Sequence, residues 1–144
     1  MGLFSRLLGG GRDSASARKE TKPRGEVYAP YGVSWGRFMP EEENQYSYDG
    51  PFYEYFEKVF MEEFPDCDIQ MEEAPFRHAM LCTFWRGGKK ALVVELKSKR
   101  STVERVRQEC GQAGIPYLRY YYDVHGWWNT RTYVTNRTRD ALGA

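Results

Sequence analysis

The sequence predicts one small α/β domain in which helices cover both faces of a mixed β-sheet, and three observations lead to that fold class. A chain of 144 residues with 41% hydrophobic and 16% aromatic side chains can bury one core but not two. Helical and strand periodicities alternate from residue 51 onward, in the order helix, three strands, helix, strand, helix. The third expected strand is apolar on both faces, which requires cover from two sides.

Residues 1–25 are expected to form a disordered basic tail in front of the domain. They carry six basic and two acidic side chains and, from Gly9 to Gly25, almost nothing that a core would bury. The apolar stretch 1–8 is too short for a signal peptide or a membrane span. Arg6 stands where N-myristoylation requires Ser or Thr. We therefore expect no stable membrane insertion.

Residues 26–50 are expected to be an extended segment that lays aromatic side chains onto the domain. These rings stand among Pro and Gly with neither helical nor strand spacing: Tyr28, Tyr31, Trp35, Phe38, Tyr46 and Tyr48. The α/β domain itself is then expected over residues 51–144.

The first element of the domain is an amphipathic helix between two prolines. Pro51 suits its first turn and Pro65 ends it. Its apolar side chains recur at helical spacing: Phe52, Phe56, Val59, Phe60 and Phe64.

Three strands come next, at Asp68–Ala74, Ala79–Trp85 and Lys89–Lys97. Gly87 and Gly88 connect the last two strands as a tight hairpin turn, since glycine adopts positive φ without steric cost. On the third strand the apolar side chains alternate between the faces, with Leu92, Val94 and Leu96 on one and Val93 on the other.

A helix, a fourth strand and a last helix complete the order. Ser101 and Glu104 form a capping box that opens the first of these helices, and Gly114 ends it. The strand Ile115–Tyr122 is expected to run parallel to the third strand because a helix crosses between them. Asn129 is expected to cap the last helix, whose shared face holds Thr130, Tyr133, Val134, Arg137 and Leu142.

Cysteine and histidine usage excludes some chemistry. Cys67, Cys82 and Cys110 lack metal-ligand spacing, and their odd number without a secretory signal indicates reduced thiols in a cytoplasmic protein. His78 and His125 are the only histidines, one in a turn and one in a loop. A zinc site or a histidine-based hydrolase therefore has little support.

Charge is divided along the chain although the net charge is only +1. Residues 41–73 hold twelve acidic and one basic side chain, whereas residues 77–139 hold thirteen basic and four acidic ones. Either the two halves pair across the fold, or the basic residues gather into a face that binds nucleic acid. The residues expected to contact phosphate are Lys99, Arg100, Arg105 and Arg107, beside Lys97.

The order of elements, with Glu95-Leu96-Lys97 on the third strand, resembles the PD-(D/E)XK superfamily, also called restriction-endonuclease-like. The closest branch is the small one related to very-short-patch-repair endonucleases and several domain families of unknown function. The resemblance covers residues 52–142 and includes the turn and strand at 113–119 and the terminal helix at 129–142. It implies an αβββαβα fold with a mixed central sheet and, for active members, a Mg²⁺-dependent nuclease site.

Glu95 and Lys97 have the spacing that this chemistry needs. Two residues apart on a strand, they project from the same face. The carboxylate would hold Mg²⁺ by oxygen while the lysine stands beside the attacking water. The alternative is a salt bridge at the rim of the sheet.

The family pattern also requires an Asp about a dozen residues earlier, where this chain has Cys82-Thr83-Phe84. A hairpin closed at Gly87 and Gly88 would place Met80, Cys82 and Phe84 on the face of Glu95. A four-residue turn at 75–78 would then add Glu73, which becomes the candidate second metal ligand and catalytic acid.

Asp66 and Glu57 are further candidate acids, with a helix-stop loop and a solvated helix face as their alternatives. If the chain is an enzyme, it is expected to be a Mg²⁺-dependent nuclease. The missing Asp favours an inactive, degenerate member.

Residues 120–131 combine aromatic rings with arginine. The rings could stack on bases while the guanidinium groups of Arg119, Arg131, Arg137 and Arg139 contact phosphates. The alternative, expected for Trp127 or Trp128, is to anchor the last helix against the sheet.

The sequence as a whole leaves two function classes open. The first is a nuclease or its degenerate nucleic-acid-binding descendant. The second is a non-catalytic protein-interaction module that keeps the fold and uses residues 26–50 for a protein partner.

Overall fold

The structure is a computed structural model that describes residues 31–74 and 79–143. Its elements in chain order are helix α2 (Phe52–Glu63), strands β1 (Asp68–Glu73), β2 (Ala79–Arg86) and β3 (Lys89–Lys97), helix α3 (Arg105–Ala113), strand β4 (Tyr117–Tyr121) and helix α4 (Arg131–Leu142). The predicted order of helices and strands is confirmed. The expected tail at 1–25, the first part of the expected aromatic segment at 26–30 and the turn at 75–78 lie outside the described residues.

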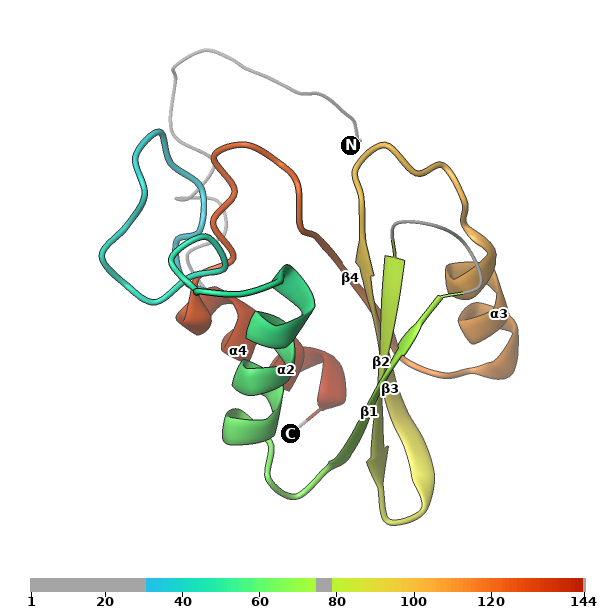
Figure 1. Ribbon diagram of the computed structural model, residues 1–144. Coiled ribbons are helices and arrows are strands. Elements are labelled where there is room, and N and C mark those ends of the chain that lie inside the picture. Colours follow the sequence, from blue (N-terminus) through green and yellow to red (C-terminus); the bar gives the residue numbers. More distant parts are fainter. Residues whose placement is uncertain (1–30, 75–78, 144) are drawn as a thin grey trace.

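The four strands form one mixed sheet in the order β1-β2-β3-β4. Neighbours are antiparallel except β3 and β4, which run parallel as predicted. Helices α2 and α4 lie on one face of this sheet and α3 lies on the other (Figure 1). Within the described part of the chain, none of the helices combines the length and hydropathy that a membrane crossing needs.

Each face of the sheet carries its own apolar cluster. The larger lies under α2 and α4 and includes fully buried rings of both layers: Tyr55, Phe56, Phe60, Phe84 and Tyr120. Burying side chains of this kind contributes about 1.5–3 kcal/mol each. The smaller cluster lies under α3 and joins Val93 to Val106 and Cys110. The alternation expected for the third strand is confirmed, since Leu92, Val94 and Leu96 belong to the first cluster and Val93 to the second.

A β-bulge decides which side chains share a face with Glu95. Gly87 and Gly88 form the predicted turn with φ of 59° and 76°, and Arg86 pairs with Lys89. The pairing then shifts by one residue between Phe84 and Trp85, so that Glu95 pairs with Leu81 and does not share a face with Met80, Cys82 and Phe84 as expected. That expectation is wrong because a regular hairpin was assumed.

The same shift moves Glu73 away from Glu95. Glu73 pairs with Met80 and shares a face with Cys82 and Phe84 as expected, but this is the face that packs against α2. Glu95 projects from the opposite face, beside Val93 and toward α3. The row that meets Glu95 contains Glu72, which pairs with Leu81.

Helix α3 begins at Arg105, later than the predicted capping box at Ser101. The Ser101 hydroxyl accepts the amide of Val103 at 3.3 Å, while Glu104 makes no capping hydrogen bond. Its carboxylate is turned toward the sheet instead, as described below. Gly114 ends the helix in the left-handed conformation, as predicted.

Helix α4 is capped by Thr130, whose hydroxyl accepts the amide of Tyr133 at 3.4 Å. Asn129, the predicted cap, stands one residue earlier with φ of 50°. Its side-chain amide instead donates to Gln45 Oε1 at 2.9 Å and to the carbonyl of Tyr121 at 3.0 Å. The predicted cap is therefore displaced by one residue, because Asn129 ties three segments together.

Residues 31–50, which we call the strap, lie along the connection between β4 and α4 (Figure 1). Trp35 forms an isolated antiparallel bridge with Trp127. The Trp128 amide donates to the Ser34 carbonyl at 2.8 Å, and the Ser34 hydroxyl accepts the amide of Thr130 at 3.0 Å. The strap thus pairs by backbone and side chain with the segment that starts α4.

Candidate functional site

Glu95 and Lys97 lie on one face of β3, as their spacing predicts, and both are buried beneath α3 and the loop before it. Glu95 is 3% exposed and Lys97 is fully buried. The hydroxyl of Tyr117 donates to Glu95 Oε1, and Arg119 Nη2 lies 3.5 Å from the same oxygen. Lys97 Nζ donates to the carbonyl of Val103. Both charged groups are therefore satisfied within the protein.

Glu104 joins these two residues into one network. Its carboxylate accepts two hydrogen bonds from Arg119, at 3.1 Å from Nη1 and at 3.0 Å from Nη2. Lys97 Nζ lies 3.5 Å from Glu104 Oε2. Arg119 also donates through Nε to the Tyr117 hydroxyl at 2.8 Å and through Nη1 to that of Tyr121 at 3.2 Å. Two cations and two carboxylates thus neutralise each other between β3, β4 and α3.

The electrostatics follow from burial and from this pairing. Burial lowers the pKa of Lys97, and the nearby positive charge of Arg119 acts in the same direction. Burial opposes ionisation of Glu104 as well, but the hydrogen bonds and charge of Arg119 outweigh it and hold the pKa of Glu104 below its usual value. Burial and the bond to Glu95 raise the pKa of Tyr117.

The predicted Mg²⁺ ligands do not come together. Glu73 and Glu95 lie on opposite faces of the sheet, and Glu95 is occupied by Tyr117 and Arg119. Among residues 31–74 and 79–143, no three His, Cys, Asp or Glu side chains gather as a metal site. Of the other candidate acids, Asp66 pairs with Arg86 at 3.2 Å. The residues present do not fit a two-carboxylate Mg²⁺ centre.

The four residues predicted to contact phosphate lie on one stretch of chain that leaves β3 and enters α3. Lys99 and Arg100 are exposed. The side chains of Arg105 and Arg107 are 63% and 66% exposed and pair with Glu109 and Glu104 respectively. Lys99 and Arg100 lie in the loop after β3, whereas Arg105 and Arg107 lie in the first turn of α3.

The loops that follow β3 and β4 are fastened to each other. The Ser98 hydroxyl donates to Asp123 Oδ2 at 2.6 Å, and the Lys99 amide donates to Asp123 Oδ1 at 2.8 Å. Because β3 and β4 are parallel, this places Lys99 at their common carboxyl end. The chain then turns to opposite faces of the sheet, through α3 after β3 and through α4 after β4. Ligands bind preferentially at such a divergence in α/β proteins.

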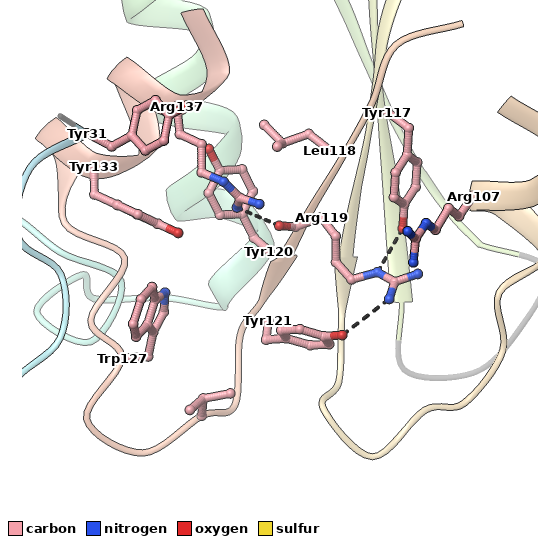
Figure 2. A pocket seen from close by; sticks show the side chains of 11 residues that line it. Tyr31, Arg107, Tyr117, Leu118, Arg119, Tyr120, Tyr121, Trp127, Tyr133 and Arg137 are labelled. Atoms are coloured by element: carbon pink, nitrogen blue, oxygen red, sulfur yellow. Dashed lines mark hydrogen bonds between the residues drawn. The ribbon is translucent and has the colours of Figure 1, made fainter. Parts of the chain in front are cut away.

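A pocket of about 670 Å³ runs along β4 and is lined from both α3 and α4. Its basic side chains are Arg107, Arg119 and Arg137. Among the described residues, those that line it include neither Asp nor Glu. Figure 2 shows Trp127, Tyr133 and Arg137 on the α4 side of the strand and Arg107, Tyr117 and Arg119 on the α3 side.

The outer edge of β4 is partly closed by side chains. Pro116 and Tyr122 make their backbone bonds to β3, so the alternate residues Arg119 and Tyr121 direct their carbonyls to the outer edge. Arg137 Nη1 donates to the Arg119 carbonyl at 2.7 Å, and Asn129 donates to that of Tyr121 at 3.0 Å. These two carbonyls are therefore not free to pair with another strand, and the outer edge of β4 exposes arginine and aromatic side chains instead.

Sequence reasoning missed the role of Glu104, Tyr117 and the bulge. Glu104 looked like half of a capping box, and nothing in its local spacing reveals Arg119 as its partner across the fold. The register was accessible from the sequence: Met80, Cys82 and Phe84 are apolar and should share a face with Leu92, Val94 and Leu96. Matching apolar rows would have placed Glu95 opposite them.

Comparison with protein-family models, with curated proteins and with solved structures finds no significant match to this chain.

Proposed function

We propose that this chain is a non-catalytic nucleic-acid-binding domain, and that Glu95 and Lys97 serve its structure. One observation carries the proposal: Lys99 and Arg100 are exposed at the joined carboxyl ends of two parallel strands, next to a pocket lined by arginines and aromatic rings. Arginine and lysine bind the phosphate backbone, whereas rings can take up bases.

The fold supports the proposal at a general level. The order of elements and the mixed sheet are those expected of a restriction-endonuclease-like domain, and we propose that the chain has that fold. A degenerate member would keep the surface that receives nucleic acid and lose the metal-binding acids. A fold alone does not determine function, so the proposal depends on the residues at the carboxyl ends of β3 and β4.

Hydrolysis is disfavoured by the partners of Glu95 and Lys97. A metal ligand needs oxygen lone pairs that face a cation, but Glu95 accepts from Tyr117 and lies against Arg119. A lysine that assists an attacking water must reach it, but Lys97 is fully buried and donates to a backbone carbonyl. Removal of either residue is therefore expected to act through stability.

The test is the salt dependence of oligonucleotide affinity. Fluorescence anisotropy with a labelled thymidine dodecamer, in buffer containing a chelator, compares the wild type with a Lys99→Ala, Arg100→Ala double variant. Each phosphate contact contributes roughly 0.7 to the slope of log K against log salt for single strands. The double variant is expected to bind more weakly and to lose about 1.4 from that slope.

The matched control is the Lys89→Ala, Lys90→Ala variant. Lys89 and Lys90 are also adjacent and exposed, but they lie at the opposite end of β3, beside the hairpin turn. This control should retain the affinity and slope of the wild type. Equal losses in both variants would mean non-specific attraction to positive charge, and no binding by the wild type at low salt would refute the proposal.

A second candidate function, protein binding, is favoured by apolar side chains on the strap. Val33, Phe38 and Met39 are 57%, 78% and 51% exposed. The Phe38→Ser, Met39→Ser variant should leave oligonucleotide affinity unchanged if nucleic acid binds at the β3 and β4 ends. Loss of oligonucleotide affinity in this variant would indicate that nucleic acid binds at the strap instead.

A further inference from the structure

We infer that the pocket along β4 takes a nucleotide unit, with the base among its aromatic rings and the phosphate on its arginines. This inference rests on the proposed function and names the part of the ligand that the pocket would receive. Its volume of about 670 Å³ lies within the range of about 300–1,000 Å³ that is usual for small-molecule sites.

The arginines and aromatic rings that line the pocket favour a ligand that combines an anionic group with a planar ring. Three arginines line the pocket, and the two acids that pair with Arg119, Glu95 and Glu104, are not among its lining residues. Four of the rings are partly exposed: Tyr31, Tyr117, Tyr121 and Trp127. Planar bases stack on such rings regardless of their sequence, while guanidinium groups hold phosphate through charged hydrogen bonds.

The pocket is organised before any ligand arrives. Arg119 is fixed by Glu104 and by the hydroxyls of Tyr117 and Tyr121, and its side chain is only 13% exposed. Arg137 lies over the Tyr120 ring at 4.8 Å and donates to the Arg119 carbonyl. Trp127 packs edge-on against Tyr133, with 5.5 Å between the ring centroids. Fixed walls reduce the entropy lost on binding.

Arg107 is the cation of the pocket that is best placed to meet a phosphate from solvent. Its side chain is 66% exposed, and its contact with Glu104 is long, at 3.6 Å. It stands two residues after Arg105 on α3, and α3 follows the loop that carries Lys99 and Arg100. A nucleic-acid strand whose phosphates contact that loop could therefore extend along α3 and place a nucleotide in the pocket.

The geometry argues against an added peptide strand as the occupant. A peptide that extends a sheet needs the outward backbone groups of the edge strand. Two of the acceptors on this edge, the carbonyls of Arg119 and Tyr121, already accept hydrogen bonds from Arg137 and Asn129. The side chains of this edge remain as the contact surface, and these are the rings and arginines described above.

The experiment separates base recognition from phosphate attraction. A thymidine dodecamer is compared with an oligomer of the same length in which every base is replaced by an abasic tetrahydrofuran unit. Val124→Trp fills the pocket from its wall, and His125→Trp adds the same bulk at the next, exposed position outside it. Thermal unfolding verifies that both variants fold.

The wild type and His125→Trp should bind the base-bearing oligomer about tenfold more tightly than the abasic one. Val124→Trp should bind the two oligomers equally. The Lys99→Ala, Arg100→Ala variant should weaken both by the same factor. Equal affinity of the wild type for both oligomers, or a preference that survives Val124→Trp, would overturn the inference while leaving the proposed function intact.

Failure of the proposed function itself has a different signature. If neither oligomer binds, calorimetric titration with thymidine 5′-monophosphate tests whether the pocket binds a single nucleotide. Binding to the wild type and to His125→Trp, but not to Val124→Trp, would support a nucleotide pocket in a protein that does not hold strands. No binding of the mononucleotide would overturn the inference.

Discussion

Glu104 is the residue on which two buried cations depend. It stands between Lys97 and Arg119, whose side chains are 1% and 13% exposed, although its own side chain is 37% exposed. A charge left without its partner in such surroundings is costly, whereas an exposed ion pair contributes little. The network is therefore most sensitive at this carboxylate.

We predict that Glu104→Gln lowers the free energy of unfolding by about 2 kcal/mol, a value reduced from the usual cost of breaking a buried pair because solvent reaches Glu104. The control is Glu109→Gln, which removes the exposed pair with Arg105 on the same helix and should cost less than about 0.5 kcal/mol. Urea denaturation measures both. Equal effects of the two variants would show that the network does not stabilise the fold.

The same residue predicts a dependence of stability on acid. The pKa of Glu104 is lower in the folded protein than its ordinary value of 4.5, so the unfolded chain takes up the proton first as the pH falls. The stabilisation is complete above pH 4.5 and is lost as the pH decreases through the folded pKa. Unfolding curves from neutral pH to pH 3 should therefore fall less steeply for Glu104→Gln than for the wild type. Parallel curves would contradict the assignment.

Among the elements, α4 depends on its N-cap residue, Thr130. Thr130 is fully buried, and its hydroxyl accepts the Tyr133 amide and donates to the carbonyl of Val33 at 3.2 Å. Thr130→Ala should cost about 1–2 kcal/mol, measured by thermal or urea unfolding. Thr130→Ser keeps the hydroxyl and should recover most of that loss. A serine variant as unstable as the alanine variant would assign the effect to the methyl group instead.

The type and order of the elements could be predicted because each has its own period or its own end signal. Phe56 and Phe60 mark one face of α2, and Gly87 with Gly88 determines a turn. The start of α3 could not be predicted in this way. A capping box would have the Glu104 carboxylate accept a hydrogen bond from a nearby backbone amide. The carboxylate instead accepts from Arg119, which is 15 residues away in sequence.

At the scale of the whole molecule, the candidate site was predicted in part. The parity of Glu95 and Lys97 is correct, and so is their place on a strand shared by two apolar layers. Their partners come from β4 and from the start of α3, and only the folded arrangement brings these together. The prediction that Glu73 shares this face is wrong because it assumes a regular hairpin, whereas a bulge adds one residue to β3. The turn residues do not reveal this bulge, but the matching apolar rows of β2 and β3 do.

This arrangement predicts the outcome of metal titration. Calorimetry with Mg²⁺ and Mn²⁺ should show no binding heat, and incubation with single- or double-stranded DNA should give no cleavage. Glu95→Ala should lower stability, since Arg119 and Tyr117 lose a buried acceptor. Metal-dependent cleavage by the wild type that disappears in Glu95→Ala would overturn the structural role assigned to this residue.

The strap has a consequence for the way the protein is made. Ser34 bonds to Thr130, which is 96 residues further along the chain. Ribosomes add about 5–20 residues per second, so roughly 5–20 s separate the synthesis of these two partners. During that interval Trp35 has neither Trp127 nor the start of α4 to pair with. Docking of the strap must therefore wait until the connection between β4 and α4 has been synthesised.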